Sequence, residues 1–426
     1  MNTDELINYL SSKAADDVFT GIYGKSREVC AYQKTRCIKA AAEFEKIFGR
    51  LPVQVYSAPG RSEICGNHTD HQNGLVLAAA ISLDTVAIVS PADDGIVRLV
   101  SEGYGEIRTD LEDLSVHKEE AASTSSIIRG VAAGFKNAGY EVGGFCAYAV
   151  TDVLSGSGLS SSAAFEVLVG NIFSGLYNGG RICAADIAKT GRFAENRYFG
   201  KPSGLMDQMA CAEGGLVYFD FKDPEDPVAE KLQADFNDLG LALCILDTKS
   251  SHADLTADYA AVPSELAKVS AFFGKNVLRD VDEELFYKKI PELRKTAGDR
   301  AILRAAHIFN ENRRVETARE AILKGDAQKF LQVIRNSGRS SHELLQNVTA
   351  PGCVHEQSLA LALMLSRRII FEDGAVRVHG GGFAGTIQAF VPCDMAAEYK
   401  RRTEEIFGEG SCYVLSIRDA GGIRVI

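Results

Sequence analysis

The segment SGSGLSSSAAFEVLVG, residues 155–170, constrains the fold of this chain more than any other stretch. A glycine-rich turn and a cluster of serines run directly into a helix with apolar residues at helical spacing. Such a turn presents backbone N–H groups at the positive end of a helix, an arrangement that binds phosphate. Serine hydroxyls can bond phosphate oxygens or complete the coordination shell of Mg²⁺. The alternative is structural, an N-cap followed by a small-residue helix that packs tightly.

The spacing of this segment differs from that of a P-loop, which requires G-x-x-x-x-G-K-[ST]. The only Gly-Lys-Ser in the chain, residues 24–26, has Phe19 where the first glycine should stand. We therefore do not expect a P-loop fold.

Composition is that of a globular chain: 46% of the 426 residues are apolar and 24% are charged. The length suggests two large domains or one two-lobed unit. A net charge of −11 argues against nucleic acid or an anionic membrane as a partner, although a local pocket can still hold a small anion. Because the first residues, MNTDELINYL, are acidic and lack an apolar core, we expect no signal peptide, and no window reaches about 18 consecutive apolar residues. Ten scattered cysteines without Cys-x-x-Cys indicate reduced thiols, so we expect a cytoplasmic protein.

Hydrophobic periodicity predicts helices and strands along the whole chain. The predicted helices cover residues 5–13, 32–48, 123–137, 161–177, 184–198 and 395–407, with a helix-rich stretch at 257–346. The predicted strands cover residues 53–58, 75–90, 144–151, 215–220, 241–247, 375–379, 386–391 and 411–417. The first strand is expected to end at Pro59-Gly60. The acidic, proline-containing segment 222–227 is the expected boundary between an N-terminal domain, 1–228, and a C-terminal domain, 229–426.

A second polar segment, SAPGRSEICGNHTDHQNG, covers residues 57–74 and lies between two predicted strands. It crowds together the charged and imidazole side chains Arg61, Glu63, His68, Asp70 and His71. A His-x-Asp-His cluster could bind a metal ion, and an exposed polar turn is the alternative. So many polar groups beside a core must satisfy one another, which favours a functional site.

A third segment, VHGGGFAGTIQAFVP at residues 378–392, contains Gly380, Gly382 and Gly385 in the pattern G-x-G-x-x-G. A strand rather than a helix is predicted to follow, so a dinucleotide-binding motif is not indicated. Glycines that permit close backbone packing or a positive φ are the simpler interpretation.

A fourth segment, GLMDQMACAEGGLVYFD at residues 204–220, begins a short apolar helix at Asp207. A carboxylate there can simply favour the helix dipole. Glu195 lies twelve residues upstream on a predicted helix, where a surface ion pair with Arg192 or Arg197 would explain it. Neither acid stands out when it is considered alone.

Together, the ordered motifs resemble the GHMP family of small-molecule kinases, and within it the galactokinases. That family has an Arg-bearing motif first, a G-x-G-L-S-S-S-A loop second and a glycine-rich motif near the end, here at residues 60–74, 156–163 and 380–385. GLMDQ matches the galactokinase pattern around a catalytic aspartate, and the resemblance extends from about residue 30 to the C-terminal SIRDAGGIRVI. It implies a two-lobed α+β GHMP kinase fold, with mixed sheets and helices in both lobes, the active site in the cleft between them and a last strand that can return to the N-terminal lobe.

The resemblance also implies roles for individual residues. Asp207 would accept or orient the proton of the sugar hydroxyl, and Arg61 would lie beside it. Ser162 and Glu195 match the residues that bind Mg²⁺. The predicted phosphate cradle for ATP consists of Gly156, Ser157, Gly158, Leu159, Ser160 and Ser161. The predicted sugar site consists of Asn67, His68, Asp70, Gly204 and Tyr259.

The chain departs from the galactokinase pattern in its first motif. Asn67 stands where galactokinases carry a glutamate that contacts the C6 end of the sugar, and Glu63 stands where they carry an asparagine. The arginines that normally follow the Tyr259 position are absent, and a common Ser-His is Ser337-Gly338. Sugar identity is therefore the weakest part of the resemblance.

The leading hypothesis is an ATP-dependent sugar 1-kinase that makes an α-sugar 1-phosphate from galactose. The rival within the class is a galacturonate 1-kinase, because Asn67 would not repel a C6 carboxylate as a glutamate would. A non-catalytic sensor of sugar and nucleotide is a third possibility, but such relatives typically lose part of the serine loop, which is intact here. We expect a monomer or a weak homo-oligomer.

Overall fold

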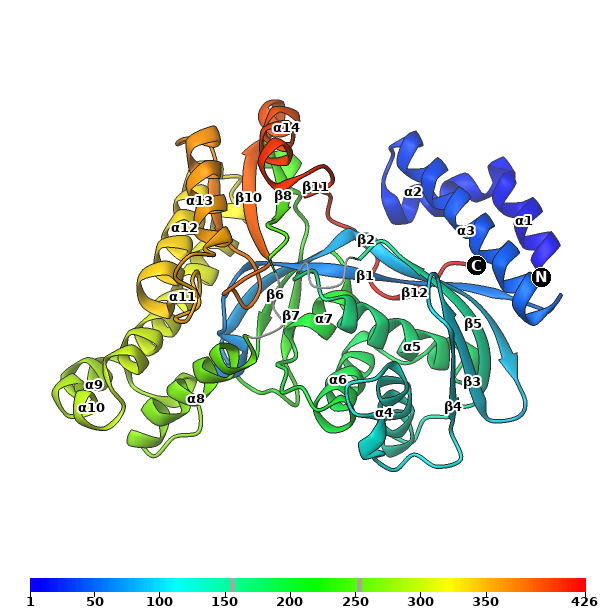
Figure 1. Ribbon diagram of the computed structural model, residues 1–426, viewed down its shortest axis with the longest axis horizontal. Coiled ribbons are helices and arrows are strands. Elements are labelled where there is room, and N and C mark those ends of the chain that lie inside the picture. Colours follow the sequence, from blue (N-terminus) through cyan, green and yellow to red (C-terminus); the bar gives the residue numbers. More distant parts are fainter. Residues whose placement is uncertain (154–157, 251–254) are drawn as a thin grey trace.

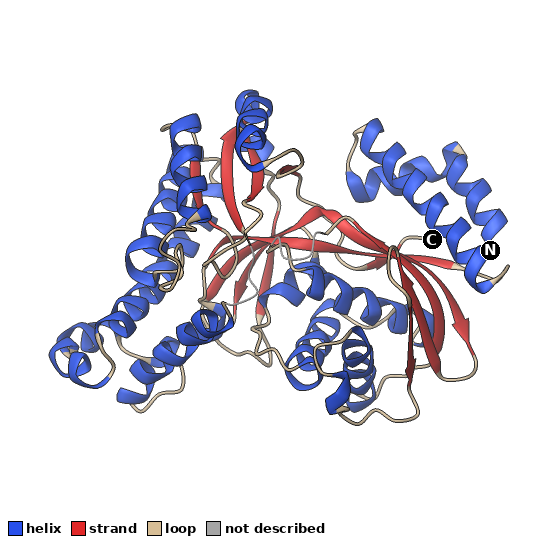
Figure 2. Cartoon of the chain, in the orientation of Figure 1, coloured by secondary structure: helices blue, strands red, loops and turns tan. Residues whose placement is uncertain are grey.

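Two β-sheets organise the chain, and helices pack against both of them (Figure 1). The computed structural model describes residues 1–153, 158–250 and 255–426. The large sheet has the strand order β12-β1-β2-β5-β3-β4, and β6 and β7 extend it from β2. The small sheet has the order β11-β8-β10-β9. Figure 2 shows how strands form the centre of the molecule while helices lie outside them.

The strands of the large sheet are β1 (Gln54–Cys65), β2 (Leu75–Ala92), β3 (Ile96–Ser101), β4 (Glu106–Asp110), β5 (Gly144–Thr151), β6 (Leu216–Asp220), β7 (Val228–Leu232) and β12 (Ile423–Arg424). Those of the small sheet are β8 (Leu241–Asp247), β9 (Ala375–Val378), β10 (Thr386–Pro392) and β11 (Cys412–Leu415). In the large sheet β3 pairs with β5 in parallel, and the small sheet is antiparallel throughout. The predicted α+β class is confirmed. The large sheet combines parallel and antiparallel strand pairs.

The helices of the first half are α1 (Thr3–Ser11), α2 (Asp16–Tyr23), α3 (Arg27–Phe48), α4 (Thr124–Asn137), α5 (Ser161–Tyr177), α6 (Ala184–Ala194) and α7 (Met206–Glu213). Those of the second half are α8 (Thr256–Phe272), α9 (Glu283–Lys288), α10 (Ile290–Thr296), α11 (Asp299–Leu323), α12 (Ala327–Ser340), α13 (Ser358–Ile370) and α14 (Ala396–Phe407). A π-helical turn, Glu195–Phe199, continues α6, and a second one, Ser341–Leu345, continues α12.

Strand β2 is apolar along most of its length because the large sheet is covered on both faces. Val86 and Ile88 pack into the core under α1–α3, whereas Ala87 and Val89 pack into the core that contains α4–α7. This alternation follows from the two-residue period of a strand. In Figure 1 the two groups of helices lie on opposite sides of the sheet.

Strand β1 does not end at Pro59-Gly60, so that prediction is wrong. It continues to Cys65, and its register with β2 shifts between Pro59 and Arg61 and again between Glu63 and Cys65. Bulges accept proline and glycine inside a strand because the ladder is interrupted there. The predictions for β5, α5 and β8, by contrast, match the observed bounds.

A third apolar core joins the two sheets. Its members include Leu77 of β2, Leu243 of β8 and Phe330 of α12, all fully or almost fully buried. The C-terminal segment also crosses back, since Ile423 of β12 pairs with Ser57 of β1. The division of the chain at residues 228 and 229 stays a prediction.

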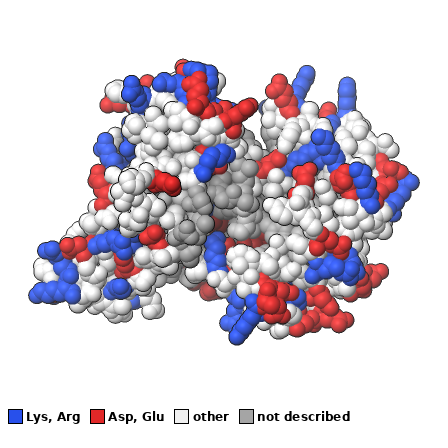
Figure 3. Space-filling view, viewed as in Figure 1, with Lys and Arg blue, Asp and Glu red and all other residues white. Residues whose placement is uncertain are grey.

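All ten cysteines are free thiols. On the face shown in Figure 3, acidic and basic side chains are interspersed. Within the described ranges, none of the helices combines the length and the apolar character needed to cross a membrane.

Candidate active site

One cavity of about 580 Å³ collects most of the predicted site residues. Its walls come from the segment after β1, the start of α5, the segment before α7, the start of α8 and the loop after β9. The predicted residues that line it are Arg61, Asn67, His68, Asp70, Gly158, Ser160, Ser161, Ser162, Gly204, Asp207 and Tyr259. Gly156 and Ser157 lie outside the described residues. Five segments that are distant in sequence therefore meet at one place.

The bulge in β1 sets the position of Arg61. The backbone N–H of Arg61 donates to the carbonyl of Leu159 at 3.1 Å, which ties β1 to the loop before α5. A Cβ on Gly60 would lie 2.8 Å from the same carbonyl oxygen, so this close approach requires glycine. Leu159 itself is fully buried in the core that joins the two sheets. Its side chain thus anchors the loop instead of facing the cavity.

Asp207 and Arg61 form the central ion pair of the site. Arg61 donates from Nε to Oδ1 at 2.7 Å and from a terminal nitrogen to Oδ2 at 2.8 Å, which is the bidentate geometry of a strong pair. Ser160 donates from its hydroxyl to Oδ2 of the same carboxylate. Burial alone would raise the pKa of Asp207, but Arg61 and Ser160 outweigh it and lower that pKa to about 2. The carboxylate is therefore ionised at neutral pH.

The start of α5 presents the serine loop to the cavity. Ser160 has a left-handed backbone, with φ 59°, and its carbonyl accepts the N–H of Ala164. A Cβ on Gly158 would meet Thr386 and His379, so this position also permits a close approach between the two halves of the chain. The N–H groups of the first turn of α5 lie at the positive end of a helix of 17 residues.

Ser162 lines the cavity and contacts Glu195, which is not among the described residues of the lining. The Ser162 hydroxyl donates to Oε1 of Glu195 at 3.3 Å, and the Gln208 amide donates to Oε2 at 3.0 Å. The Glu195 side chain is only 3% exposed. A surface ion pair with an arginine does not explain it, because Arg192 pairs with Glu225 instead.

His68 and Asp70 also contribute side chains to the lining of the cavity. Burial and the neighbouring His71 lower the pKa of His68 to about 3, so its ring is neutral. His68 Nε2 lies 3.1 Å from the carbonyl of Gly381 and must donate to it, which leaves Nδ1 as an acceptor. A Cβ on Gly204 would collide with Oδ2 of Asp70, so the Gly204 backbone lies directly against that carboxylate. In the described part of the chain, no three His, Cys, Asp or Glu side chains lie together as a metal-binding group, and this includes the side chains of the His-x-Asp-His cluster.

Both the nitrogen and the oxygen of the Asn67 side-chain amide form hydrogen bonds within the protein. Its Nδ2 donates to the Gly380 carbonyl at 2.7 Å and to Glu63 at 3.2 Å, and its Oδ1 accepts from Asn347 at 2.8 Å. Glu63 is in turn paired with Arg377, and both are almost completely buried. The amide that was predicted to face the C6 end of a sugar therefore serves a buried polar network.

The third glycine-rich segment places three carbonyls against Asn67 and His68 of the polar segment 57–74, which we name the sugar motif, and against Tyr259 of α8. Those of Gly380, Gly381 and Gly382 accept from Asn67, His68 and Tyr259, respectively. Gly380 and Gly382 have positive φ, and a Cβ on Gly381 would collide with the ring of Tyr259. Close backbone packing with positive φ, the simpler interpretation of this motif, is confirmed.

The sequence motifs did not single out two side chains that contact Glu195. Lys201 lines the cavity and pairs with Glu195 at 2.6 Å, and Gln208 donates to both Glu195 and the buried Glu166. The only signal for Lys201 was its place between Gly200 and Gly204, six residues after Glu195. Gln208 follows Asp207 within GLMDQ and was visible only as part of that motif.

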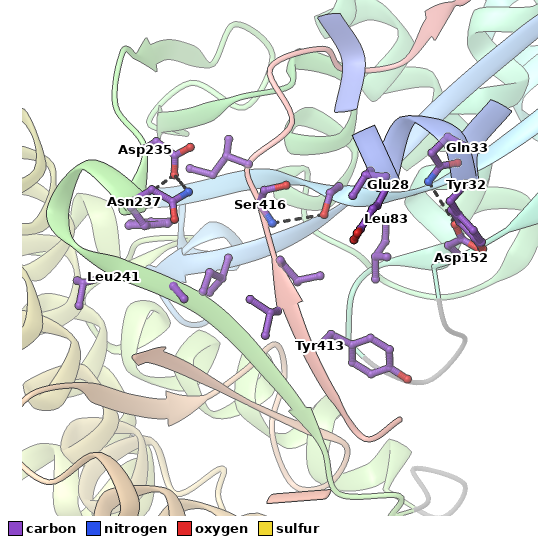
Figure 4. Close-up of a pocket in the computed structure, with 18 of the residues that line it drawn as sticks. Glu28, Tyr32, Gln33, Leu83, Asp152, Asp235, Asn237, Leu241, Tyr413 and Ser416 are labelled. Carbon is purple, nitrogen blue, oxygen red and sulfur yellow. Dashed lines mark hydrogen bonds between the residues drawn. The ribbon is translucent and has the colours of Figure 1, made fainter. Parts of the chain in front are cut away.

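A second cavity, of about 800 Å³, is separate from the site (Figure 4). Its walls include Tyr32 of α3, Asp152 after β5 and Tyr413 of β11. Of the predicted site residues that the structure describes, none lines this cavity.

Two family models match the chain in the segments that build the site. Residues 42–91 match "Galactokinase galactose-binding signature", and residues 126–215 match "GHMP kinases N terminal domain". The first contains Arg61 and the sugar motif, and the second contains the serine loop, Glu195 and Asp207.

Solved structures share the fold over most of the chain. The galactokinase of Lactococcus lactis, solved in complex with galactose, is 24% identical and has a TM-score of 0.78, over 90% of this chain and 98% of that chain. A D-glycero-D-manno-heptose 1-phosphate kinase from Bacteriodes thetaiotaomicron is 17% identical, with a TM-score of 0.59 over 88% and 98% of the two chains. The L. major mevalonate kinase, in complex with R-mevalonate, is 15% identical, with a TM-score of 0.58 over 86% and 96%.

The chain thus shares the fold of these kinases, and its residues 126–215 carry the GHMP kinase N-terminal domain. Its first motif carries the galactokinase galactose-binding signature. These two family matches indicate a sugar kinase enzyme.

Proposed function

We propose that this enzyme transfers the γ-phosphoryl group of ATP to the anomeric hydroxyl of galactose or a close relative and releases the α-sugar 1-phosphate. One observation carries the proposal. The Arg61–Asp207 pair lies in a single cavity with the serine loop and with the sugar motif. A reacting hydroxyl and a phosphoryl group bound by those two segments would meet at this pair.

Asp207 orients the sugar hydroxyl and accepts its proton. The anomeric oxygen bonds to the γ-phosphorus while the bond from that phosphorus to the β,γ-bridging oxygen breaks, which leaves ADP. Phosphoryl transfer passes through a loose transition state, so the proton can leave late and a weak base is sufficient. A carboxylate with a pKa of about 2 meets that requirement.

Arg61 stabilises the charge on the transferring group. Its guanidinium is almost completely buried and already held by Asp207 and by the Gly158 carbonyl, so it needs little reorganisation during the reaction. Positioning and charge stabilisation of this kind supply most of the catalysis in phosphoryl transfer.

ATP and Mg²⁺ fit the chemistry of the residues near the serine loop. The candidate metal ligands, the Ser162 hydroxyl and the Glu195 carboxylate, are the oxygen donors that Mg²⁺ prefers. Mg²⁺ is commonly held by one or two protein ligands together with nucleotide phosphates, so a larger protein cage is not required. When bound, the ion would neutralise charge on those phosphates.

The cavity favours a neutral sugar over a hexuronate. Among the described residues that line it, the lysine and arginine side chains are those of Lys201 and Arg61, and each is already paired with a carboxylate. Asp70 contributes another carboxylate, and Asn67 is engaged in the buried network. Nothing in this lining offers a free positive charge to a C6 carboxylate.

The test is a substrate panel with the purified full-length enzyme, ATP and Mg²⁺. Galactose, galacturonate, glucose and N-acetylgalactosamine are compared by ADP release, and ³¹P and ¹H NMR assign the position and anomer of the phosphate. We expect galactose 1-phosphate in the α configuration. Preferential phosphorylation of galacturonate would support the rival, and tight binding of sugar and nucleotide without turnover would support a sensor.

We also propose a cytoplasmic location and a monomeric or weakly self-associating state. The free state of all ten cysteines is consistent with a reducing compartment. Cell fractionation and light scattering of the purified enzyme test these two points.

A further inference from the structure

A lysine occupies the position where the nucleotide's metal ion is proposed to bind. Nζ of Lys201 lies 2.6 Å from Oε1 of Glu195, the same oxygen that accepts the Ser162 hydroxyl. A lysine carries a positive charge at neutral pH, so the Glu195 carboxylate already has a cation beside it. The protein alone thus neutralises a carboxylate that the proposed function assigns to Mg²⁺.

The conformation of the backbone after the π-helical turn places Lys201 beside Glu195. The N–H groups of Gly200 and Lys201 both donate to the Glu195 carbonyl, at 3.0 and 3.1 Å. Gly200 has φ +90°, which turns the chain back on itself at the end of the π-helical turn. Two hydrogen bonds between Asn196 and Ser203 close the same loop. The pairing of Lys201 with Glu195 is therefore built into the loop.

The two partners differ in their freedom to move. The Glu195 side chain is 3% exposed and is held by Gln208 and Ser162, whereas the Lys201 side chain is 55% exposed. A long lysine side chain at a cavity rim can change its rotamer at little cost. Leaving the buried Glu195 carboxylate unpaired is costly, so the lysine can move away only when another cation takes its place.

Lys201 balances the negative charge of the Glu195 carboxylate. The carboxylates of Asp207 and Glu195 accept hydrogen bonds from serines at the start of α5, and Arg61 balances the charge of Asp207. Without Lys201, the buried Glu195 would lack a cationic partner until a metal ion arrived, and burial of an unpaired charge is costly. When a divalent ion binds at Glu195, it neutralises that carboxylate, and the Lys201 ammonium is no longer needed there. The ammonium could then pair with the nucleotide phosphates.

We propose that the Lys201 ammonium pairs with Glu195, at the position of the metal ion, while the nucleotide is absent. When the metal ion binds there, the Lys201 side chain turns and its ammonium pairs with the nucleotide phosphates instead. This inference rests on the proposed function, since it takes the nucleotide and its metal as ligands. It assigns to Lys201 two opposite effects: the lysine competes with the free metal ion and assists the metal–nucleotide complex.

The experiment measures the two effects separately. Mn²⁺ binding to the nucleotide-free enzyme is followed by electron paramagnetic resonance, and binding of the Mg²⁺ complex of a non-hydrolysable ATP analogue is followed by calorimetry. For Lys201→Met we expect free Mn²⁺ to bind about fivefold more tightly and the nucleotide complex about tenfold more weakly. Lys201→Arg keeps the charge and should bind Mn²⁺ as the unmodified enzyme does.

The matched control is Lys136→Met, which removes a lysine of α4 from an exposed pair with Glu141. It should leave both affinities unchanged. Glu195→Gln should abolish the gain in Mn²⁺ affinity when it is combined with Lys201→Met.

Unchanged or weaker Mn²⁺ binding by Lys201→Met, in a variant whose thermal unfolding is normal, would overturn the proposal. So would an unchanged affinity for the nucleotide complex. Both measurements are made without sugar, so opposite shifts in an enzyme that phosphorylates no tested sugar would uphold Lys201's role and count against the proposed reaction.

Discussion

Asp207 combines features that suit an orienting carboxylate. It is ionised, bound by Arg61 in a bidentate pair and placed in the first turn of α7. Asp207→Asn keeps the shape of the side chain but removes the charge and leaves Arg61 without its carboxylate. We expect kcat to fall by about 10²–10⁴, the usual contribution of one proton-transfer group. Steady-state kinetics with galactose measure this.

The control for Asp207→Asn is Asp299→Asn, which removes a carboxylate from an exposed pair with Arg294. It should leave kcat within a factor of two of the unmodified enzyme. Equal kcat values for the Asp207 and Asp299 variants would contradict the role given to Asp207.

This chain has Glu63 and Asn67 where the galactokinase pattern has an asparagine and a glutamate, respectively. The structure explains how the exchange is accommodated, because Asn67 donates to Glu63 while Arg377 pairs with it. Asn67→Glu would set a second carboxylate against Glu63 and the Gly380 carbonyl. Like charges in a buried site are costly, so we expect a loss of about 3 kcal/mol in unfolding free energy. Thermal and chemical denaturation measure it.

The double variant Glu63→Asn/Asn67→Glu restores one carboxylate and one amide. It should recover most of the stability lost in Asn67→Glu, and comparison of the two single variants with the double variant gives their coupling. If the losses of unfolding free energy in the two single variants add up in the double variant, the two side chains do not depend on each other. A simple shift of sugar preference in a fully stable Asn67→Glu would contradict the buried network as the main role of Asn67.

At the scale of single elements, the bulge in β1 links sequence to catalysis. Gly60 lets β1 approach the loop before α5, and Arg61 follows it directly into the cavity. Gly60→Ala would force a Cβ against the Leu159 carbonyl at 2.8 Å. Overpacking of this kind costs about 1–3 kcal/mol and would displace Arg61, so both melting temperature and kcat/KM should fall.

Gly21→Ala is the matched control for Gly60→Ala. Gly21 lies inside α2 with open space around it, and alanine favours a helix by about 0.5–1 kcal/mol over glycine. Its melting temperature should rise or stay constant while kcat/KM does not change. If Gly60→Ala behaves in the same way, the close approach at Gly60 is not required.

Elements with strong periodicity were predictable from the sequence. The bounds of α5, β5 and β8 were anticipated because each is a buried apolar run with clear flanking residues. Strands β4 and β7 were missed because they are largely exposed and carry charged side chains at many positions. The path of β1 through Pro59-Gly60 depends on a contact with Leu159, a hundred residues away, which no local pattern encodes.

The same limit applies to the site. Motifs identified residues that the fold brings into one cavity, such as Arg61 and Asp207. They could not indicate that Asn347 would bind Asn67 across 280 positions, or that Gly200 would turn Lys201 back onto Glu195. Those contacts arise from tertiary structure and from a single backbone conformation.

At the scale of the whole molecule, Asp84 joins elements that are far apart in the sequence. This fully buried carboxylate on β2 accepts from Arg36 of α3 at 2.6 Å, from Arg418 near the C-terminus at 2.6 Å and from the Tyr23 hydroxyl of α2 at 2.6 Å. Ser57 of β1 also donates to it. One side chain therefore connects the N-terminal helices, the large sheet and the returning C-terminal segment.

Asp84→Asn tests how strongly that connection holds the molecule together. The substitution removes the charge that two buried guanidinium groups share, and a broken buried pair typically costs about 3–5 kcal/mol. The expected loss should appear in thermal and chemical denaturation. Asp16→Asn, which removes the exposed carboxylate of a partly exposed pair with Lys34, should cost at most about 1 kcal/mol. Equal effects of the two variants would mean that the N-terminal helices and the C-terminal segment are held by their apolar contacts alone.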